Sequence, residues 1–224
     1  MAVLKQRLYR KNQAEGYDLI HLETSADIVK MPDSNNTVSD VISSINTAVS
    51  ALATDPYVLD TDNISRGAIV SWAGYEWRVV HKDSLYMYMI TKDLLERLIQ
   101  FGSDNKYATS NIAKHAQSLE DYLPTAATKH LGTITIRDRK AKVFIPEAYH
   151  LGYNNTWFRG YTYFSPSYDA GRIANYDGTA WGYWTSSSGG TGKDVIVVSS
   201  SGKFSINADP SDAYGFRPCV AYKR

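Results

Sequence analysis

The pattern of apolar and polar positions changes its period along the chain. Residues 17–24, Tyr-Asp-Leu-Ile-His-Leu-Glu-Thr, alternate in part between the two classes, which predicts a strand. After a polar break at residues 31–36 the period becomes helical, and Thr37 and Asp40 have the spacing of a capping box at a helix start. The apolar stripe of the predicted helix, residues 37–52, consists of Val38, Val41, Ile45, Ala48 and Leu52.

The predicted helix over residues 37–52 has two possible roles. Ile42 and Val49 widen the apolar stripe, while Ser, Asn and Thr occupy the opposite face. The stripe could pack on its own domain, or it could join copies of the chain, since β-branched residues along a seam favour self-association. A helix this short is marginal alone, so neighbouring contacts have to support it. Of the two roles, we expect an oligomerisation helix.

A polar linker divides the chain into two parts. Residues 54–56 are Thr-Asp-Pro and residues 60–63 are Asp-Thr-Asp-Asn, which are typical of a connection without regular structure. The boundary is therefore expected near residue 60. Residues 1–60 would form an N-terminal extended segment with the oligomerisation helix, and residues 61–224 a separate domain.

The second part mixes strand and helix periods. Short apolar runs bounded by turn residues predict strands over residues 68–72, 75–80, 86–90, 142–146, 183–187, 195–199, 203–206 and 216–221. Helical spacing predicts helices over residues 92–101 and 110–123. Helices set between irregular strands predict an α+β fold. The remaining stretch, 151–183, exceeds ordinary loop length, and such loops are usually functional or disordered.

Residues 153–184 have an unusual composition. They contain six Tyr, three Trp and two Phe, a single large aliphatic residue (Ile173), and neither Lys nor Glu. A core prefers Leu, Ile and Val, and a solvated loop would use Lys and Glu. Tyr and Trp with Ser, Gly, Asn and Arg are typical of a binding surface, because Tyr offers a large rigid area with an adaptable hydroxyl. The alternative is a Tyr-rich loop packed on its own domain; Phe164, Ile173 and Trp184 are the expected anchors.

Overall composition excludes several function classes. The net charge is +1, from 24 basic and 23 acidic residues, so there is no basic excess for nucleic acid or an anionic membrane. No apolar run reaches the roughly 18 residues of a membrane helix. Residues 1–7 lack the apolar core of a signal peptide, so synthesis in the cytoplasm and release by lysis are expected. Cys219 is the single cysteine and is expected to be a buried, inert thiol.

Candidates for catalysis or metal binding are few, and we expect neither an enzyme nor a cofactor. Residues 188–193, Ser-Gly-Gly-Thr-Gly-Lys, lack the spacing of a phosphate loop and predict a hairpin turn. Asp169 and Asp177 could form a glycosidase pair, but with Arg159 and Arg172 they are better interpreted as polar contacts at a binding rim. His150 is expected to be a surface residue or a rim contact. Metal-ligand spacing is absent among the histidines, which are His21, His81, His115, His130 and His150.

Four short pieces carry a resemblance to a known family. They are Tyr-Glu-Trp-Arg-Val-Val at 75–80, Val-Phe-Ile-Pro-Glu-Ala at 143–148, Tyr-Trp-Thr-Ser-Ser-Ser at 183–188 and Gly-Phe-Arg-Pro at 215–218. In this order and spacing, residues 74–221 resemble the C-type-lectin-like domains grouped near formylglycine-generating-enzyme and bacteriophage variable proteins. The resemblance implies a C-type-lectin-like head. In some variable proteins of this kind, a retroelement randomises adenines in the coding sequence, which yields mostly Tyr, Ser, Asp, His and Asn.

The N-terminal residues carry a second resemblance. Residues 8–12 and 17–27 are similar to the start of tail-fibre proteins from phages and prophages of Gram-positive gut bacteria. This resemblance implies attachment to a tail or baseplate and a trimeric assembly. The sequence departs from calcium-dependent lectins, because it lacks their Glu-Pro-Asn or Gln-Pro-Asp and Trp-Asn-Asp triplets. Asp-Pro-Ser-Asp at 209–212 is better interpreted as a turn, and one cysteine cannot form the pair of the oxidase branch.

The leading hypothesis is a homotrimeric, virion-located receptor-binding protein of a phage or prophage tail. It would bind a host-cell surface protein or glycan and other tail or baseplate proteins, without nucleic acid, membrane insertion or a metal. The alternatives are a tail-associated cell-wall glycan hydrolase and a structural tail or decoration protein. The expected ligand-binding residues are Tyr153, Asn154, Asn155, Trp157, Arg159, Tyr161, Tyr163, Tyr168, Asp169, Asn175, Tyr176, Asp177, Trp181 and Tyr183.

Overall fold

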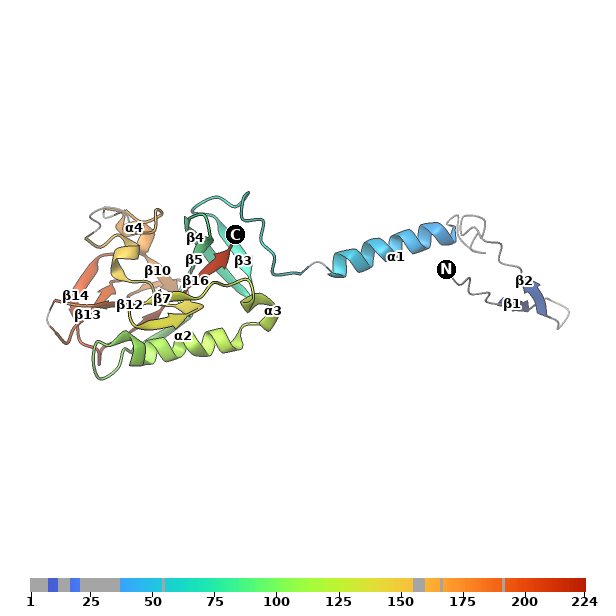
Figure 1. Ribbon diagram of the computed structural model, residues 1–224. Helices are drawn as coiled ribbons and strands as arrows, with labels where there is room; N and C mark the ends of the chain where they lie inside the picture. Colours follow the sequence, from blue (N-terminus) through green and yellow to red (C-terminus); the bar gives the residue numbers. More distant parts are fainter. Residues whose placement is uncertain are drawn as a thin grey trace. The chain divides into compact units, whose positions relative to one another are not determined.

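The computed structural model describes residues 8–11, 17–20, 37–53, 55–154, 160–165, 167–190 and 192–224 (Figure 1). The chain divides into two compact units, Met1–Pro56 and Tyr57–Arg224. Tyr57 belongs to the second unit, where its carbonyl accepts hydrogen bonds from the Trp72 indole (2.9 Å) and the Tyr222 hydroxyl (3.0 Å). None of the described helices is long and apolar enough to span a membrane.

The N-terminal unit contains a small hairpin and a helix. Strands β1 (Leu8–Lys11) and β2 (Tyr17–Ile20) pair antiparallel. The strand predicted over residues 17–24 is confirmed for 17–20, and residues 21–24 lie outside the described residues. Helix α1 (Val38–Ala53) confirms the predicted helix.

The predicted capping box begins helix α1. The Asp40 amide donates to the Thr37 hydroxyl (3.2 Å), and the Thr37 amide donates to the Asp40 carboxylate (2.7 Å). These reciprocal bonds satisfy backbone donors that the first helical turn leaves unpaired, and they lower the pKa of Asp40. Ile42 and Ile45 are about half exposed, at 47% and 55%. Within its own unit, the apolar face of α1 is therefore not buried at these two positions.

The second unit is built on two five-stranded sheets. The first is antiparallel, in the order β3 (Ile69–Trp72), β4 (Tyr75–Lys82), β5 (Tyr86–Thr91), β16 (Cys219–Lys223), β9 (Val143–Phe144). The second has the order β14 (Phe204–Ala208), β13 (Val195–Val198), β12 (Tyr183–Ser188), β15 (Ala213–Phe216), β6 (Glu96–Gln100). In this sheet β12 and β15 are parallel and the other pairs are antiparallel.

Helices and two small hairpins complete the unit. Helix α2 (Asn111–Tyr122) lies on the opposite side of the sheets from the short helix α4 (Asp169–Arg172) (Figure 1). The other elements are α3 (Thr125–Thr128), η1 (Tyr107–Thr109), η2 (Ala148–Leu151), and the hairpins β7 (Ile134–Ile136)–β8 (Arg139–Ala141) and β10 (Ala174–Tyr176)–β11 (Thr179–Trp181). This mixture confirms the α+β prediction.

Large aromatic side chains fill the core and satisfy their polar atoms. Trp77 and Trp184 are fully buried. Their indole N–H groups donate to backbone carbonyls, Trp77 to Trp72 at 3.0 Å and Trp184 to Ile99 at 2.7 Å. A buried indole N–H without such an acceptor would destabilise the fold, because a buried donor with no partner costs free energy. Cys219 is also buried, as predicted, and burial raises the pKa of its thiol.

The helix predicted over residues 92–101 is wrong. Residues 96–100 form strand β6, which pairs with β15 through Gln100–Ala213 and Ile99–Tyr214. Leu98 has φ +61°, a left-handed conformation that no α-helix interior accommodates, and its side chain is 59% exposed. The leucine spacing that suggested a helix therefore does not correspond to one buried face of a helix.

Most other predicted elements are confirmed with shifted ends, but the strand at residues 216–221 is interrupted. Strand β15 ends at Phe216 and β16 begins at Cys219, in the other sheet. Arg217 and Pro218 carry the chain between the two sheets. The predicted turns are also confirmed for their described residues. Gly189, Gly190, Gly192 and Lys193 lie between β12 and β13, and Asp212 donates its amide to the Asp209 carbonyl at 2.9 Å between β14 and β15.

Candidate ligand-binding surface

The aromatic stretch is organised around a buried arginine. Arg172, at the end of α4, is 1% exposed. Its guanidinium donates to the carbonyls of Leu151 (3.2 Å), Ser165 (2.8 Å) and Gly202 (2.8 Å) and pairs with the Asp169 carboxylate. The predicted position of Arg172 at a binding rim is therefore wrong, because the side chain joins segments of the fold from the inside.

A second buried arginine is joined to the first. Arg217, also 1% exposed, donates to the carbonyls of Thr91 and Lys92, each at 3.0 Å. It also donates to the Arg172 carbonyl (2.9 Å) and the Tyr183 hydroxyl (3.1 Å), and that hydroxyl donates to the same Arg172 carbonyl at 2.9 Å. The Arg172 carbonyl therefore connects the aromatic stretch to the crossover between the sheets.

Two of the residues predicted to contact ligand are core residues. Tyr183 is fully buried and Tyr161 is 4% exposed, so neither ring reaches the surface. Tyr161 stacks on His150 with centroids 4.5 Å apart and planes 6° apart. Among the described residues its hydroxyl has no hydrogen-bond partner, and burial raises its pKa well above the ordinary value. Sequence could not separate these tyrosines from surface ones, because tyrosine suits both environments.

Several other predicted residues lie partly against their own domain. The Tyr153 ring meets Phe204 edge-on at 5.1 Å. Tyr163 lies below the Arg78 guanidinium at 5.3 Å, and its ring is 3.3 Å from where a Cβ on Gly67 would stand. Asn155, Trp157 and Arg159 lie outside the described residues. Of the predicted anchors, Phe164 and Trp184 are buried as expected, but Ile173 is 37% exposed and is not an anchor.

The predicted residues that remain fully or partly exposed are Tyr153, Asn154, Tyr163, Tyr168, Asp169, Asn175, Tyr176, Asp177 and Trp181. Tyr168 is 44% exposed, and its ring covers Gly171, where a Cβ would stand 2.2 Å from it. Asp169 and Asp177 belong to different elements, α4 and the β10–β11 turn. Asp169 is engaged by the buried Arg172 guanidinium, so its side chain serves the fold rather than facing Asp177 as a glycosidase pair would require.

The β10–β11 hairpin carries two partly exposed aromatic residues, Tyr176 and Trp181, which also pack against the core. Tyr176 and Trp181 both lie against Arg97 of β6, whose guanidinium carbon is 5.1 Å and 5.6 Å from the two ring centres. The hairpin is fixed to the segment before β6, because Leu94 donates its amide to the Asn175 carbonyl at 2.9 Å. The Asp93 carboxylate accepts the Asn175 amide at 3.3 Å. We call Arg97, Tyr176 and Trp181 the aromatic–arginine cluster.

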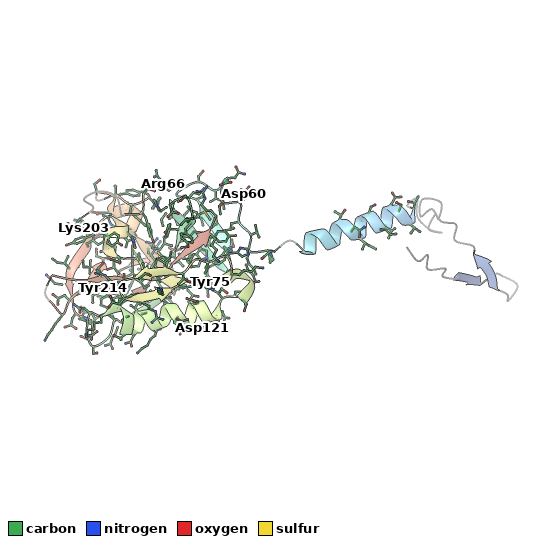
Figure 2. The ribbon with its side chains drawn as sticks, viewed as in Figure 1. Asp60, Arg66, Tyr75, Asp121, Lys203 and Tyr214 are labelled. Carbon is green, nitrogen blue, oxygen red and sulfur yellow. The ribbon has the colours of Figure 1, made fainter. Side chains whose placement is uncertain are left out.

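A groove of about 540 Å³ lies beside this cluster, and we call it the β12 groove. Tyr214, one of its residues, lies in the half of the unit that carries β13 and β14, away from Asp60 (Figure 2). The groove runs where β12 begins, next to β13 and β15, since Tyr183 pairs with both Val198 and Gly215. The residues that line it are Ala180, Trp181, Gly182, Ser199, Ser200, Asp212, Ala213 and Tyr214.

Sequence analysis identified Trp181 but missed the rest of the β12 groove. Ser199, Ser200 and Asp212 lie in turns with ordinary turn composition, and Arg97 was assigned to a helix. Gly182 has a specific requirement, because a Cβ there would stand 3.0 Å from the Tyr214 ring and 3.0 Å from the Val198 carbonyl oxygen. No sequence pattern brings these segments together, since β12 meets β15 only after three intervening turns.

A smaller polar cavity, about 160 Å³, lies on the other sheet. His81, Tyr88, Tyr149, His150 and Tyr161 are among the residues that line it. His150 is half-buried rather than a surface residue, and its Nδ1 accepts the Glu147 amide at 3.2 Å. Burial, followed by the nearby His81 and Arg137, lowers the pKa of His150 to about 3. The ring is therefore neutral near pH 7.

The comparisons with known proteins add no assignment. No family model, curated protein or solved structure matches the chain. Among the described residues, no group of His, Cys, Asp and Glu side chains is arranged to hold a metal ion. The C-type-lectin-like and tail-fibre resemblances therefore stay predictions.

Replacing Arg172 should destabilise the second unit strongly. Arg172→Ala would leave the carbonyls of Leu151, Ser165 and Gly202 without their donor, and we expect the free energy of unfolding to fall by about 3 kcal/mol or more. Arg172→Lys should cost less, because it retains the charge. Urea unfolding followed by tryptophan fluorescence measures this, since every Trp lies in that unit. Arg97→Ala is the surface control, and an equal loss in both variants would contradict the assignment.

His150 should make stability fall in mild acid. Its folded pKa of about 3 lies below the ordinary value of 6.5, so the unfolded chain binds more protons between these values. The contribution is complete above pH 6.5 and is lost as pH falls towards 3, by at most about 1.4 kcal/mol per pH unit. His150→Phe, which retains a stacking ring, should flatten this dependence in unfolding measurements from pH 7 to 4.5. An unchanged slope would contradict the assignment.

Proposed function

We propose that the chain is a phage or prophage tail receptor-binding protein that displays the aromatic–arginine cluster and the β12 groove to a host-cell ligand. The observation that carries this proposal is the pair of partly exposed rings, Tyr176 and Trp181, which both contact the Arg97 guanidinium beside an open groove. Aromatic and arginine side chains are enriched at binding hot spots. A surface with a purely structural role would not need partly exposed aromatic rings, so their exposure favours a binding role.

Rigidity of the support favours a binding role. Tyr176 ends strand β10 and Trp181 ends strand β11 of a paired hairpin, and hydrogen bonds to Asp93 and Leu94 fix that hairpin to the segment before β6. A ligand meeting such a surface loses less free energy to ordering than it would on a mobile loop. Asn154, Tyr168 and Asp177 are exposed, so side chains at these positions would be available to contact a ligand.

The N-terminal unit fits a role in attachment and assembly. By the resemblance given above, β1 and β2 belong to the segment that binds a tail or baseplate, and the second unit is a C-type-lectin-like head. The exposed apolar positions of α1 suit a seam between three copies. Three heads on one particle would raise the strength of attachment to a cell beyond that of one head, without any new contact.

Binding to bacterial cells tests the receptor-binding proposal. The fluorescently labelled full chain is expected to bind at least one strain in a panel of Gram-positive gut bacteria. A double variant, Tyr176→Ala with Trp181→Ala, should weaken that binding at least about ten-fold, because it removes both aromatic anchors. Tyr122→Ala is the matched control, since Tyr122 is 81% exposed on α2 and belongs neither to the cluster nor to the lining of the β12 groove. Absence of binding, or equal binding by all variants, would contradict the proposal.

The assembly proposal has its own test. Light scattering of the full chain should give a mass near three times the 25.0 kDa of one chain. Ile42→Ser with Ile45→Ser should shift the mass towards the monomer, because it places hydroxyls on the apolar face of α1. Leu85→Ser is the control, because Leu85 is 65% exposed outside α1. A monomeric wild-type chain, or a double variant that stays trimeric, would count against the seam.

A further inference from the structure

The ligand class of the β12 groove can be narrowed by its size. Its volume of about 540 Å³ lies within the roughly 300–1,000 Å³ typical of sites for small ligands. A stable protein partner normally covers about 800 Å² and roughly 20–30 residues on each side. The eight residues that line the groove are far fewer. The groove therefore suits a short chain of small rings better than the face of a folded protein.

The chemistry of the lining narrows the class further. Trp181 and Tyr214 supply partly exposed rings, and between them Ala180, Gly182 and Ala213 leave the space unfilled. The hydroxyls of Ser199 and Ser200 and the carboxylate of Asp212 add polar groups to the lining, besides the polar atoms of the two rings. A pyranose ring has an apolar C–H face that packs on an aromatic ring, and hydroxyls at its edge that pair with such oxygen atoms.

Charge separates neutral from anionic sugars. Asp212 is the single charged residue among the described residues that line the groove, so a phosphate or carboxylate on the ligand would be repelled there. Arg97 does not line the groove; its guanidinium lies against the rings of Tyr176 and Trp181. The Asp212 carboxylate accepts only the Asp209 amide, at 3.2 Å, among the hydrogen bonds described for it, which leaves oxygen lone pairs available for ligand hydroxyls.

We propose that the β12 groove binds an uncharged saccharide, without calcium. This inference rests on the proposed function and specifies the ligand of the same surface. One carboxylate in the groove is too few for a calcium ion, which takes six to eight oxygen ligands. In this proposal the sugar stacks directly on Trp181 and forms hydrogen bonds with Asp212 and the serines, so no calcium ion is needed to hold it.

Cell-binding measurements with selectively treated cells test the ligand class. Mild periodate cleaves the vicinal diols of sugars, and proteinase K removes surface proteins. Binding of the full chain to its strain should be lost after periodate, retained after proteinase K, and unchanged by EDTA. Binding that survives periodate but not proteinase K would overturn the saccharide and leave the receptor-binding proposal standing. Binding to no strain at all would instead overturn the receptor-binding proposal itself.

Direct binding tests whether the β12 groove is the site. On an array that holds uncharged, sialylated and phosphorylated oligosaccharides, the full chain should bind uncharged members, and titration should give about ten-fold weaker binding for Trp181→Ala. Asp212→Asn should also weaken binding, although its side chain retains an oxygen for the Asp209 amide. Ser200→Arg, at an exposed turn position, should block the groove without removing a buried contact.

The results that contradict the groove assignment are specific. Preference for sialylated or phosphorylated glycans, or stronger binding of such glycans by Asp212→Asn, would overturn the neutral class. Undiminished binding by both Trp181→Ala and Ser200→Arg would place any saccharide elsewhere. Tyr122→Ala again serves as the matched control, because it removes an exposed ring from α2 and should leave the affinity unchanged.

Discussion

Two buried arginines hold the second unit together, and they are joined because the Arg217 guanidinium donates to the backbone carbonyl of Arg172. A buried cation is costly unless hydrogen bonds surround it, and here Arg217 and Arg172 are satisfied mainly by backbone carbonyls. A long, polar, aromatic stretch has few aliphatic side chains with which to form a core of its own. The arginines supply the missing connections, because one planar group can bind carbonyls from several segments.

This arrangement explains how residues 153–184, which have the composition of a loop, can form a rigid surface. Arg172 ties α4 to the carbonyls of Leu151 and Gly202, on either side of the stretch in sequence. Gly202 is required there, since it has φ +81° and a Cβ would stand 2.0 Å from the Asp169 carbonyl. The turn that holds Ser199 and Ser200 is thereby fixed against α4. The part of the β12 groove formed by Ser199 and Ser200 thus depends on the close contact between Gly202 and α4.

Local patterns predicted local structure well and packing poorly. The Thr37–Asp40 box and the apolar runs of the strands were sufficient because their determinants are neighbours in sequence. Residues 96–100 have the leucine spacing of a helix, but pairing with β15 over more than 100 intervening residues decides their conformation. The candidate surface shows the same limit: tyrosine composition found Tyr176 and Trp181, but it could not show that Tyr161 and Tyr183 point inward. Arg97 belongs to a strand distant in sequence, so the composition of residues 153–184 could not identify it.

Strand β16 has a consequence for the order of synthesis. It lies between β5 and β9, so the first sheet depends on a strand that leaves the ribosome after every other described element. Until Cys219–Lys223 has emerged, β5 presents an unpaired edge, and such edges pair readily with other chains. A nascent chain therefore cannot complete its first sheet until these last residues have emerged. Messages truncated even slightly upstream of Cys219 would yield aggregation-prone products rather than partly functional ones.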